Sequence, residues 1–222
     1  MKNCHYYNKK EVIHIDKKLM SLKEVCEYTG WGQTKVRPDA IIPSKDDENS
    51  GYDIYANFEE DYIIIPSHET VLIPTGIASA INDNYYLQVQ ERGSTGSKGM
   101  KYGAGVIDSS YRGEIFIAIT NTNNSEIVIS KLSHEELLSK YGKEDEDGDI
   151  CIEYVYKKEN LCLYLNDEIG ECYKAIIYPY TKAIAQLVVH EVPKMNVKEI
   201  SYDELKAIPS KRGSGSLGSS GK

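Results

Sequence analysis

The stretch GAGVIDSSYRGEIFIAIT, residues 103–120, holds the clearest strand pattern of the chain and a turn directly before it. Isoleucines recur at every second position from Ile115 to Ile119, which is the period of a strand with one buried face. Asp108 and Tyr111 flank two serines, and this composition predicts a hairpin turn. An Asp in such a turn commonly satisfies turn amides, so this stretch alone indicates structure rather than chemistry.

The neighbouring sequence continues as short strands from position 40 to 120. Runs rich in β-branched residues and tyrosine alternate with Pro and Gly, and no helical pattern comes between them; the runs are YIIIP, TVLIPTGIASAI, YYLQVQERG and EIFIAITN. Regularly spaced short strands with turn signals are typical of a sandwich or barrel. We therefore predict an all-β fold whose core covers residues 36–121 and 181–208.

Three further segments depart from this strand rhythm. Residues 1–35 form an N-terminal extension with a short helix predicted over 21–30, where Ser and Glu make a capping box and Gly ends the helix. Residues 122–180 contain the capped helix pattern SHEELLSKYG, the acidic run KEDEDGD and two strands, ICIEYVY and NLCLYLN. We interpret 122–180 as an inserted α+β lobe, with a second capped helix in SYDELKAI and a tail over 209–222.

Composition limits the classes of partner and compartment. The formal net charge of −8 over 222 residues disfavours broad nucleic-acid binding, which requires basic stripes. The five cysteines form no CxxC pair, which is typical of reduced thiols in an intracellular protein. No apolar run approaches the roughly 20 residues of a membrane span. The first ten residues, MKNCHYYNKK, lack the hydrophobic region of a signal peptide. We expect a cytoplasmic protein that binds neither membrane nor nucleic acid.

A Gly/Ser-rich cluster, QERGSTGSKGM, follows one of the predicted strands. It offers Arg92, closely spaced backbone amides, two hydroxyls and a lysine. Amide-rich turns form concave nests for anions, and an Arg fork binds two oxygens at once. The spacing of a Walker A loop is absent. By itself the cluster is compatible with an ordinary loop as well as with an oxyanion site.

Five short motifs carry a more specific signal because of their order. SGYDIYA at 50–56, RGSTGSKG at 92–99, GAGVIDSSYRG at 103–113, AIAQLV at 183–188 and RGSGSLGSSG at 212–221 resemble, in order, the five motifs of the trimeric dUTPase family. The resemblance covers 40–120 and 182–222 and leaves out the first 35 residues and most of 122–180. It implies a jelly-roll-like β-barrel, and hydrolysis of dUTP to dUMP and pyrophosphate.

The resemblance also implies roles in the third motif. Asp108 would orient and deprotonate the water that attacks the α-phosphate. Because an Asp of ordinary pKa near 3.9 is a weak base at neutral pH, its effect would be mostly positioning. Tyr111 would pack against the deoxyribose and leave no room for a 2′-hydroxyl. The backbone of Gly105, Val106 and Ile107 would read the uracil edge.

The remaining matched positions would bind the triphosphate. Arg92, Gly93 and Ser94 would grip its oxygens, and Gln186 would lie at the α-phosphate. Mg²⁺ is expected on the phosphate oxygens with most of its water shell, because it keeps several waters in such sites. Asp53 is the candidate outer-shell carboxylate, although a strand-edge Asp beside a turn explains it equally well.

The tail has two interpretations that composition does not separate. Gly/Ser richness is typical of a flexible linker, yet glycine amides with one Arg also suit a wrap around phosphates. By the resemblance, Arg212 would contact the γ-phosphate, and Gly218, Ser219 and Ser220 would close over it. Leu217 stands where the family usually has an aromatic, and it would cover the uracil without stacking.

A second departure lies in the second motif, which reads Arg-Gly-Ser-Thr where Arg-Ser-Gly-Leu is common; the hydroxyl has moved by one place.

Two other functions remain open. A dCTP deaminase-type enzyme shares the fold, but the third motif of such enzymes has a pattern like HRIDPGW, whereas this chain has GVIDSSY. A nucleotide-responsive regulatory or scaffold protein could act through the inserted lobe. The resemblance further implies a homotrimer with shared active sites.

Overall fold

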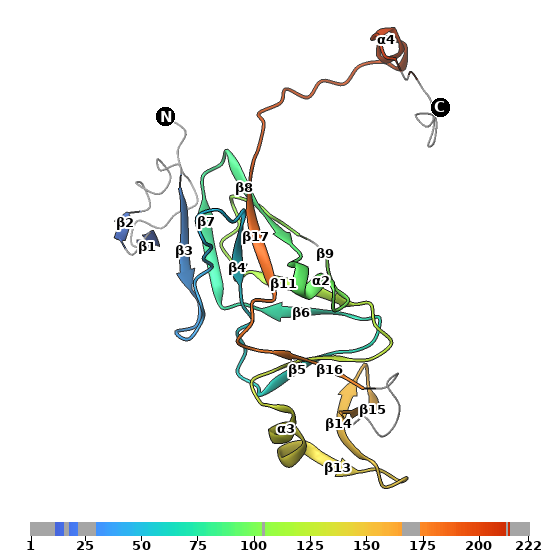
Figure 1. Ribbon diagram of the computed structural model, residues 1–222. Coiled ribbons are helices and arrows are strands. Elements are labelled where there is room, and N and C mark those ends of the chain that lie inside the picture. Colours follow the sequence, from blue (N-terminus) through green and yellow to red (C-terminus); the bar gives the residue numbers. More distant parts are fainter. Residues whose placement is uncertain are drawn as a thin grey trace. The chain divides into compact units, whose positions relative to one another are not determined.

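The structure is a computed structural model (Figure 1), and it describes residues 12–15, 18–21, 30–103, 105–165, 174–211 and 213. Strands dominate the described part of the chain, as predicted. They form several small sheets, and the described strands do not close into one barrel. None of the described helices has both the length and the apolar character needed to cross a bilayer.

The four-stranded sheet that carries most of the predicted site has the order β10-β8-β17-β4. All its neighbouring pairs are antiparallel, and β17 pairs with both β4 and β8. Its strands are β4 (Gly51–Ile54), β8 (Tyr85–Gln90), β10 (Val106–Ile107) and β17 (Ala185–Glu191). A single-turn helix, α2 (Gly93–Gly96), follows β8 directly. The sheet therefore places the first, second and fourth motifs side by side.

A second sheet of order β6-β11-β9 carries the predicted strand after the third motif. It consists of β6 (Thr70–Pro74), β9 (Met100–Gly103) and β11 (Phe116–Asn121), all antiparallel. Two smaller ladders pair β3 (Trp31–Lys35) with β7 (Ile77–Ile81) and β1 (Val12–Ile15) with β2 (Lys18–Ser21).

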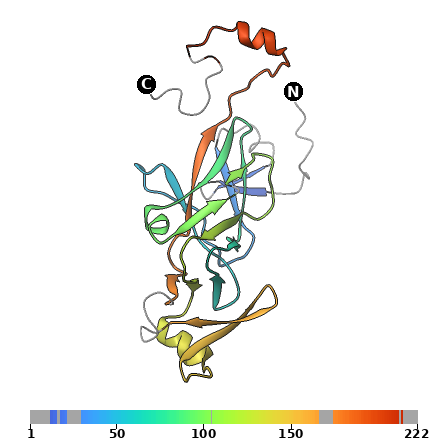
Figure 2. The same ribbon diagram turned by 90° about the vertical axis from the view of Figure 1, so that its right-hand side faces the viewer.

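The remaining strands lie at the end of the structure that is away from the four-stranded sheet, beyond β6 (Figures 1 and 2). Strand β12 (Ile127–Ser130) pairs antiparallel with β5 (Tyr62–Ile65) and parallel with β16 (Ile176–Pro179). The chain between β12 and β16 forms α3 (His134–Tyr141) and a sheet of β13 (Gly142–Glu144), β14 (Ile150–Tyr156) and β15 (Glu159–Tyr164). Within 122–180, β12 and β16 thus belong to the same sheet as β5, whereas α3 and β13–β15 are the described elements that stand outside that sheet.

Two hydrophobic clusters correspond to these two regions. The larger one includes Ile117, Ile119, Leu87 and Leu187, all 0% exposed. The predicted buried face of residues 115–119 is thereby confirmed. The smaller one gathers Leu137 of α3, Ile152 of β14 and Leu163 of β15 against Val128 of β12. The 122–180 segment therefore has an apolar core of its own.

The capped helices were predicted correctly, since Ser133 caps α3 and Ser201 caps α4 (Tyr202–Ala207) through capping boxes. The helix predicted over 21–30 lies mostly outside the described residues. Helix α4 belongs to a second compact unit, Pro193–Lys222, which is separate from Met1–Val192.

The hairpin predicted across Asp108–Tyr111 is wrong. The Tyr111 amide does donate to the Asp108 carbonyl at 3.0 Å, so a tight turn is present. The strands on either side, however, do not pair with each other, because β10 pairs with β8 whereas β11 pairs with β6 and β9. The turn therefore lies within a wide loop that links two sheets.

Candidate functional site

An open pocket of about 440 Å³ lies where β4, β17 and α2 meet. It brings together side chains or backbone from the first, second and fourth motifs, and its lining residues are Asn49, Ser50, Gly51, Asp53, Arg92, Gly93, Ser94 and Gln186. Five of these eight, Asp53, Arg92, Gly93, Ser94 and Gln186, were predicted as site residues. Asn49, Ser50 and Gly51 were not, although Ser50 and Gly51 open the first motif at 50–56 and Asn49 directly precedes it.

Arg92 supplies the cationic group of this pocket. Its Nε lies 2.8 Å from Asp53 Oδ1, and a terminal nitrogen donates to Asp53 Oδ2 at 3.0 Å. Asp53 faces Gln186 in the β4–β17 register. Both side chains of the ion pair are about one-third exposed, at 30% and 31%. The other terminal nitrogen donates to the Ser94 hydroxyl and to the Ala183 carbonyl, each at 3.4 Å, so the Arg fork is held on both sides while its side chain stays partly exposed in the pocket.

The two hydroxyls of the second motif have different environments. Ser94 is exposed and lines the pocket. Thr95 is 0% exposed, accepts the Arg92 amide at 3.1 Å and donates to the Arg92 carbonyl at 3.0 Å. Although the hydroxyl has moved by one place in the motif, Ser94 is the one positioned to meet a ligand. Thr95 holds the turn that presents Arg92.

Gln186 lines the pocket from β17. Its amide nitrogen donates to the Glu91 carbonyl at 2.7 Å, which fixes the side chain beside the second motif. Gly51 makes this possible, because a Cβ there would lie 2.2 Å from the Gln186 amide oxygen and 2.9 Å from its Cβ. The amide of Gln186 consequently occupies space that a Cβ at position 51 would need.

Two tyrosines, of which Tyr178 is buried and Tyr102 is half-buried, support the backbone of 183–184 next to the pocket. Tyr178, 1% exposed, donates its hydroxyl to the Ala183 carbonyl at 2.7 Å, and Tyr102 donates to the Ile184 carbonyl. Burial raises the pKa of both phenols, so they stay protonated donors at neutral pH. Sequence reasoning missed both residues, because their contacts join segments that are far apart in the packed sheets.

The third-motif residues lie elsewhere on the same sheet. The Val89 amide donates to the Gly105 carbonyl at 2.7 Å, and Val106 and Ile107 pair with Gln88 and Leu87. Asp108 is exposed, and no hydrogen bond or ion pair joins its carboxylate to another described residue. Tyr111 is 46% exposed, and its hydroxyl donates to the Glu114 carbonyl at 2.8 Å.

Within one chain, Asp108 does not lie near the pocket lined by Arg92 and Gln186, which we call the anion pocket. Ile107 is opposite Leu87 on β8, and Arg92 comes five residues later. At about 3.3 Å per residue this separation is roughly 16 Å along the strand direction. No residue of 105–111 lines the pocket. The predicted tail residues Arg212, Leu217, Gly218, Ser219 and Ser220 lie outside the described part of the chain.

A metal site built from protein side chains is absent from the described residues, which contain no cluster of three His, Cys, Asp or Glu side chains that could hold an ion. Asp53, the predicted outer-shell carboxylate, has both oxygens engaged by Arg92. This donor set suits an ion that arrives on a ligand and keeps its water shell, rather than one held directly by protein.

Comparisons with known proteins agree with this geometry. A protein-family model described as dUTPase matches residues 38–133. The deoxyuridine 5′-triphosphate nucleotidohydrolase of Leptospira interrogans serogroup Icterohaemorrhagiae serovar copenhageni is 31% identical over 99 residues, which cover 43% of this chain and 68% of that protein. The enzyme of the same name from Chlamydia pneumoniae is 38% identical over 110 residues, covering 47% and 68% of the two chains.

A solved structure supports the same fold. The Staphylococcus bacteriophage 80alpha dUTPase with dUPNHPP superposes with a TM-score of 0.57 at 20% identity, over 88% of this chain and 100% of that one. The architecture is therefore the all-β, jelly-roll-like fold of dUTPases. Together with the relatives of at least 30% identity, this shows that the chain belongs to the dUTPase family.

Proposed function

We propose that this protein hydrolyses dUTP to dUMP and pyrophosphate. The observation that carries the proposal is the anion pocket, in which Arg92, Ser94 and Gln186 converge in a chain of the dUTPase family. A triphosphate presents the oxygens that an Arg fork and a hydroxyl bind best. Arg92 and Ser94 hold the phosphate chain, and Gln186 lies beside the phosphate under attack.

Phosphoryl transfer requires a positioned water and neutralised charge more than covalent help from the protein. Asp108 meets the first requirement, because its carboxylate is exposed and free to accept a hydrogen bond from water. Arg92 meets the second, once its interaction with Asp53 is shared with the substrate. Tyr111 packs on the deoxyribose, and the backbone of 105–107 binds the uracil edge.

Mg²⁺ belongs to this proposal as part of the substrate complex. It would neutralise phosphate charge, and its water shell would face Asp53, because Mg²⁺ gives up its waters reluctantly and binds mainly through phosphates. Asp53 has a second role in this arrangement, because its ion pair holds the Arg92 side chain in its orientation before the nucleotide binds.

The site is complete only if another copy of the chain contributes to it. The Ile107–Leu87 pair lies five residues, or roughly 16 Å at the strand rise, from Arg92, and Asp108 follows Ile107, whereas Asp108 and Arg92 must act on one triphosphate. We therefore propose a symmetric homotrimer in which one subunit supplies the third motif and a neighbour supplies the anion pocket. The tail over 209–222 would close over the bound nucleotide as a lid.

Pyrophosphate and ammonia release test the proposed function directly. The purified protein is incubated with Mg²⁺ and, separately, dUTP, dCTP and UTP. We expect pyrophosphate from dUTP, little from UTP and no ammonia from dCTP. Ammonia from dCTP would instead indicate a deaminase.

The variant Asp108→Asn keeps the size of the side chain and removes the carboxylate. We expect turnover of dUTP to fall by about 10²–10⁴-fold, the usual worth of a general base. Because Asp108 is exposed, the melting temperature should not change. A variant that retains more than about a tenth of the wild-type rate would contradict the assigned role.

A further inference from the structure

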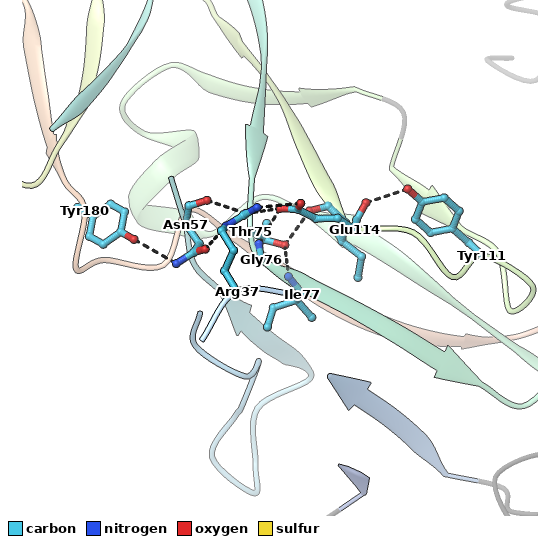
Figure 3. A network of polar contacts seen from close by, with 9 residues as sticks. Arg37, Asn57, Thr75, Gly76, Ile77, Tyr111, Glu114 and Tyr180 are labelled. Carbon is cyan, nitrogen blue, oxygen red and sulfur yellow. Dashed lines mark hydrogen bonds and ion pairs between the residues drawn. The ribbon is translucent and has the colours of Figure 1, made fainter. Parts of the chain in front are cut away.

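A partly buried network of polar contacts adjoins the turn that presents Tyr111 (Figure 3). Resting on the proposed function, we propose that Arg37 and Glu114 are positioning residues: their ion pair fixes the backbone that holds Tyr111, and thereby sets how well the site rejects ribonucleotides. Neither residue touches the anion pocket. Their contacts run from the Tyr111 ring inward to the core.

Tyr111 is held at two points although its ring is exposed. Its hydroxyl donates to the Glu114 carbonyl at 2.8 Å. Its ring packs over Gly113, where an added Cβ would lie 2.5 Å from the hydroxyl oxygen and 2.7 Å from the ring carbon that bears it. The orientation of the ring is therefore determined by the backbone of 113–114.

The Glu114 side chain anchors that backbone. It is only 13% exposed, and Arg37 binds both of its carboxylate oxygens through a forked pair. The Gly76 amide also donates to Oε1 at 2.8 Å. Burial raises the pKa of Glu114, but the hydrogen bonds from Arg37 and Gly76 lower it by more, so the carboxylate stays charged at neutral pH.

Arg37 is fixed in turn by a segment on its other side. Its Nε donates to the Asn57 side chain, and a terminal nitrogen donates to the Asn57 carbonyl at 2.8 Å. Asn57 is 2% exposed, and its own amide donates to the Pro74 carbonyl at 2.7 Å. A bidentate pair between two such fixed groups leaves little freedom for rotation. The chain of contacts therefore runs from the core to the Tyr111 ring.

This geometry matters for sugar selection because a 2′-hydroxyl is rejected by close packing. A ring that can shift by a fraction of an ångström admits the extra oxygen, whereas a ring tied to a rigid carbonyl does not. Loosening the ion pair should therefore act on discrimination between dUTP and UTP. A contact that served stability alone would leave discrimination unchanged.

The test compares kcat/KM for dUTP with kcat/KM for UTP in the full-length protein. Glu114→Gln keeps the shape of the side chain and removes its charge, and Tyr111→Phe removes the hydroxyl that bonds the Glu114 carbonyl. We expect each to lower the dUTP/UTP ratio by about tenfold, since small displacements of positioning groups have effects of this order or larger. The double variant should lower it no further, because both changes break the same link.

Asp61→Asn is the matched control, a carboxylate-to-amide change in the Asp61–Lys140 pair that links β5 to α3. Its ratio should equal that of the wild type. An unchanged ratio in Glu114→Gln would overturn the inference, even if the melting temperature falls. If Glu114→Gln does not fold, Tyr111→Phe decides, since an unchanged ratio there would show that the link has no effect. A wild type that releases no pyrophosphate from dUTP would refute the proposed function instead.

Discussion

Gly51 shows how one missing Cβ can determine a binding site. Its backbone is in β4, opposite Val188 of β17, and the Gln186 side chain occupies the space that any larger residue would fill. The close approach is to Gln186 Cβ as well as to its amide, so a change of rotamer cannot relieve it. The position of the amide in the pocket thus depends on a residue that has no functional group.

We predict that Gly51→Ala impairs substrate binding. The methyl group must displace Gln186 or separate β4 from β17, and either shift breaks the Gln186–Glu91 hydrogen bond of 2.7 Å. Losing one such bond should raise KM for dUTP by about fivefold, from a net worth near 1 kcal/mol. Steady-state kinetics give the value. Gly103→Ala is the matched control, because nothing lies within 4 Å of a Cβ there and the residue does not line the pocket, so KM should stay near the wild-type value.

At the scale of elements, ion pairs and tyrosine hydroxyls join segments that are distant in the chain. Lys140 and Tyr141 of α3 both donate to Asp61 beside β5, and Lys157 and Tyr156 both bind Glu69 beside β6. These contacts attach α3 and the β14–β15 hairpin to the main sheets. The Arg37–Glu114 pair does the same for the third-motif loop, but it is more deeply buried.

We predict an acid-sensitive contribution of Glu114 to stability. Because its folded pKa lies below its ordinary value of about 4.3, the unfolded state binds the proton more tightly. The contribution is fully present above that pH and is lost as the pH falls through the folded pKa. Above about pH 5, Glu114→Gln should lower the free energy of unfolding by about 1–3 kcal/mol, the cost of unpairing buried partners.

Urea unfolding of wild type and Glu114→Gln between about pH 3 and pH 7 checks this prediction. The difference between their free energies of unfolding should shrink below about pH 4.3, because the wild type then loses the charge that the variant lacks. Other carboxylates with lowered pKa, such as Asp61 and Glu69, are present in both proteins and cancel. A constant difference across the range would contradict the assignment.

At the scale of the whole molecule, the four-stranded sheet carries parts of the site at both of its ends. The anion pocket lies at the end of β8 near Gln90, and the Asp108 turn follows β10, which pairs with β8 at Leu87 and Gln88. Closing a symmetric ring is the simplest way to bring the two ends of different copies together. Activity would then require assembly.

We predict that two inactive variants restore each other. Arg92→Ala lacks the phosphate grip and Asp108→Asn lacks the base, so each alone should be inactive. If the chains are unfolded together in equal amounts and refolded, about a quarter of the shared sites in a statistically mixed trimer carry both intact groups. Activity near that fraction, with a trimeric mass by light scattering, is the expected result. No recovery in a verified mixed oligomer would place the whole site within one chain.

Local patterns in the sequence were sufficient for the strands and for the capped helices. The alternation of Ile115, Ile117 and Ile119 predicted a buried face, and the Ser133 and Ser201 capping boxes marked helix starts, because each depends on neighbours a few residues away. The order of the motifs also indicated the family that the comparisons show. These features depend on local periodicity and on short words, which a sequence displays directly.

Long-range pairing decided the rest. The composition of Asp108–Tyr111 predicted a hairpin, yet the strands on its two sides pair with different partners. The reason is that strand pairing depends on tertiary neighbours and not only on the connecting turn. The same reason explains why Thr95 rather than Ser94 is buried, why Gly51 must be small, and why Arg37 meets Glu114 across 77 positions. Each depends on atoms brought together only by the packed sheets.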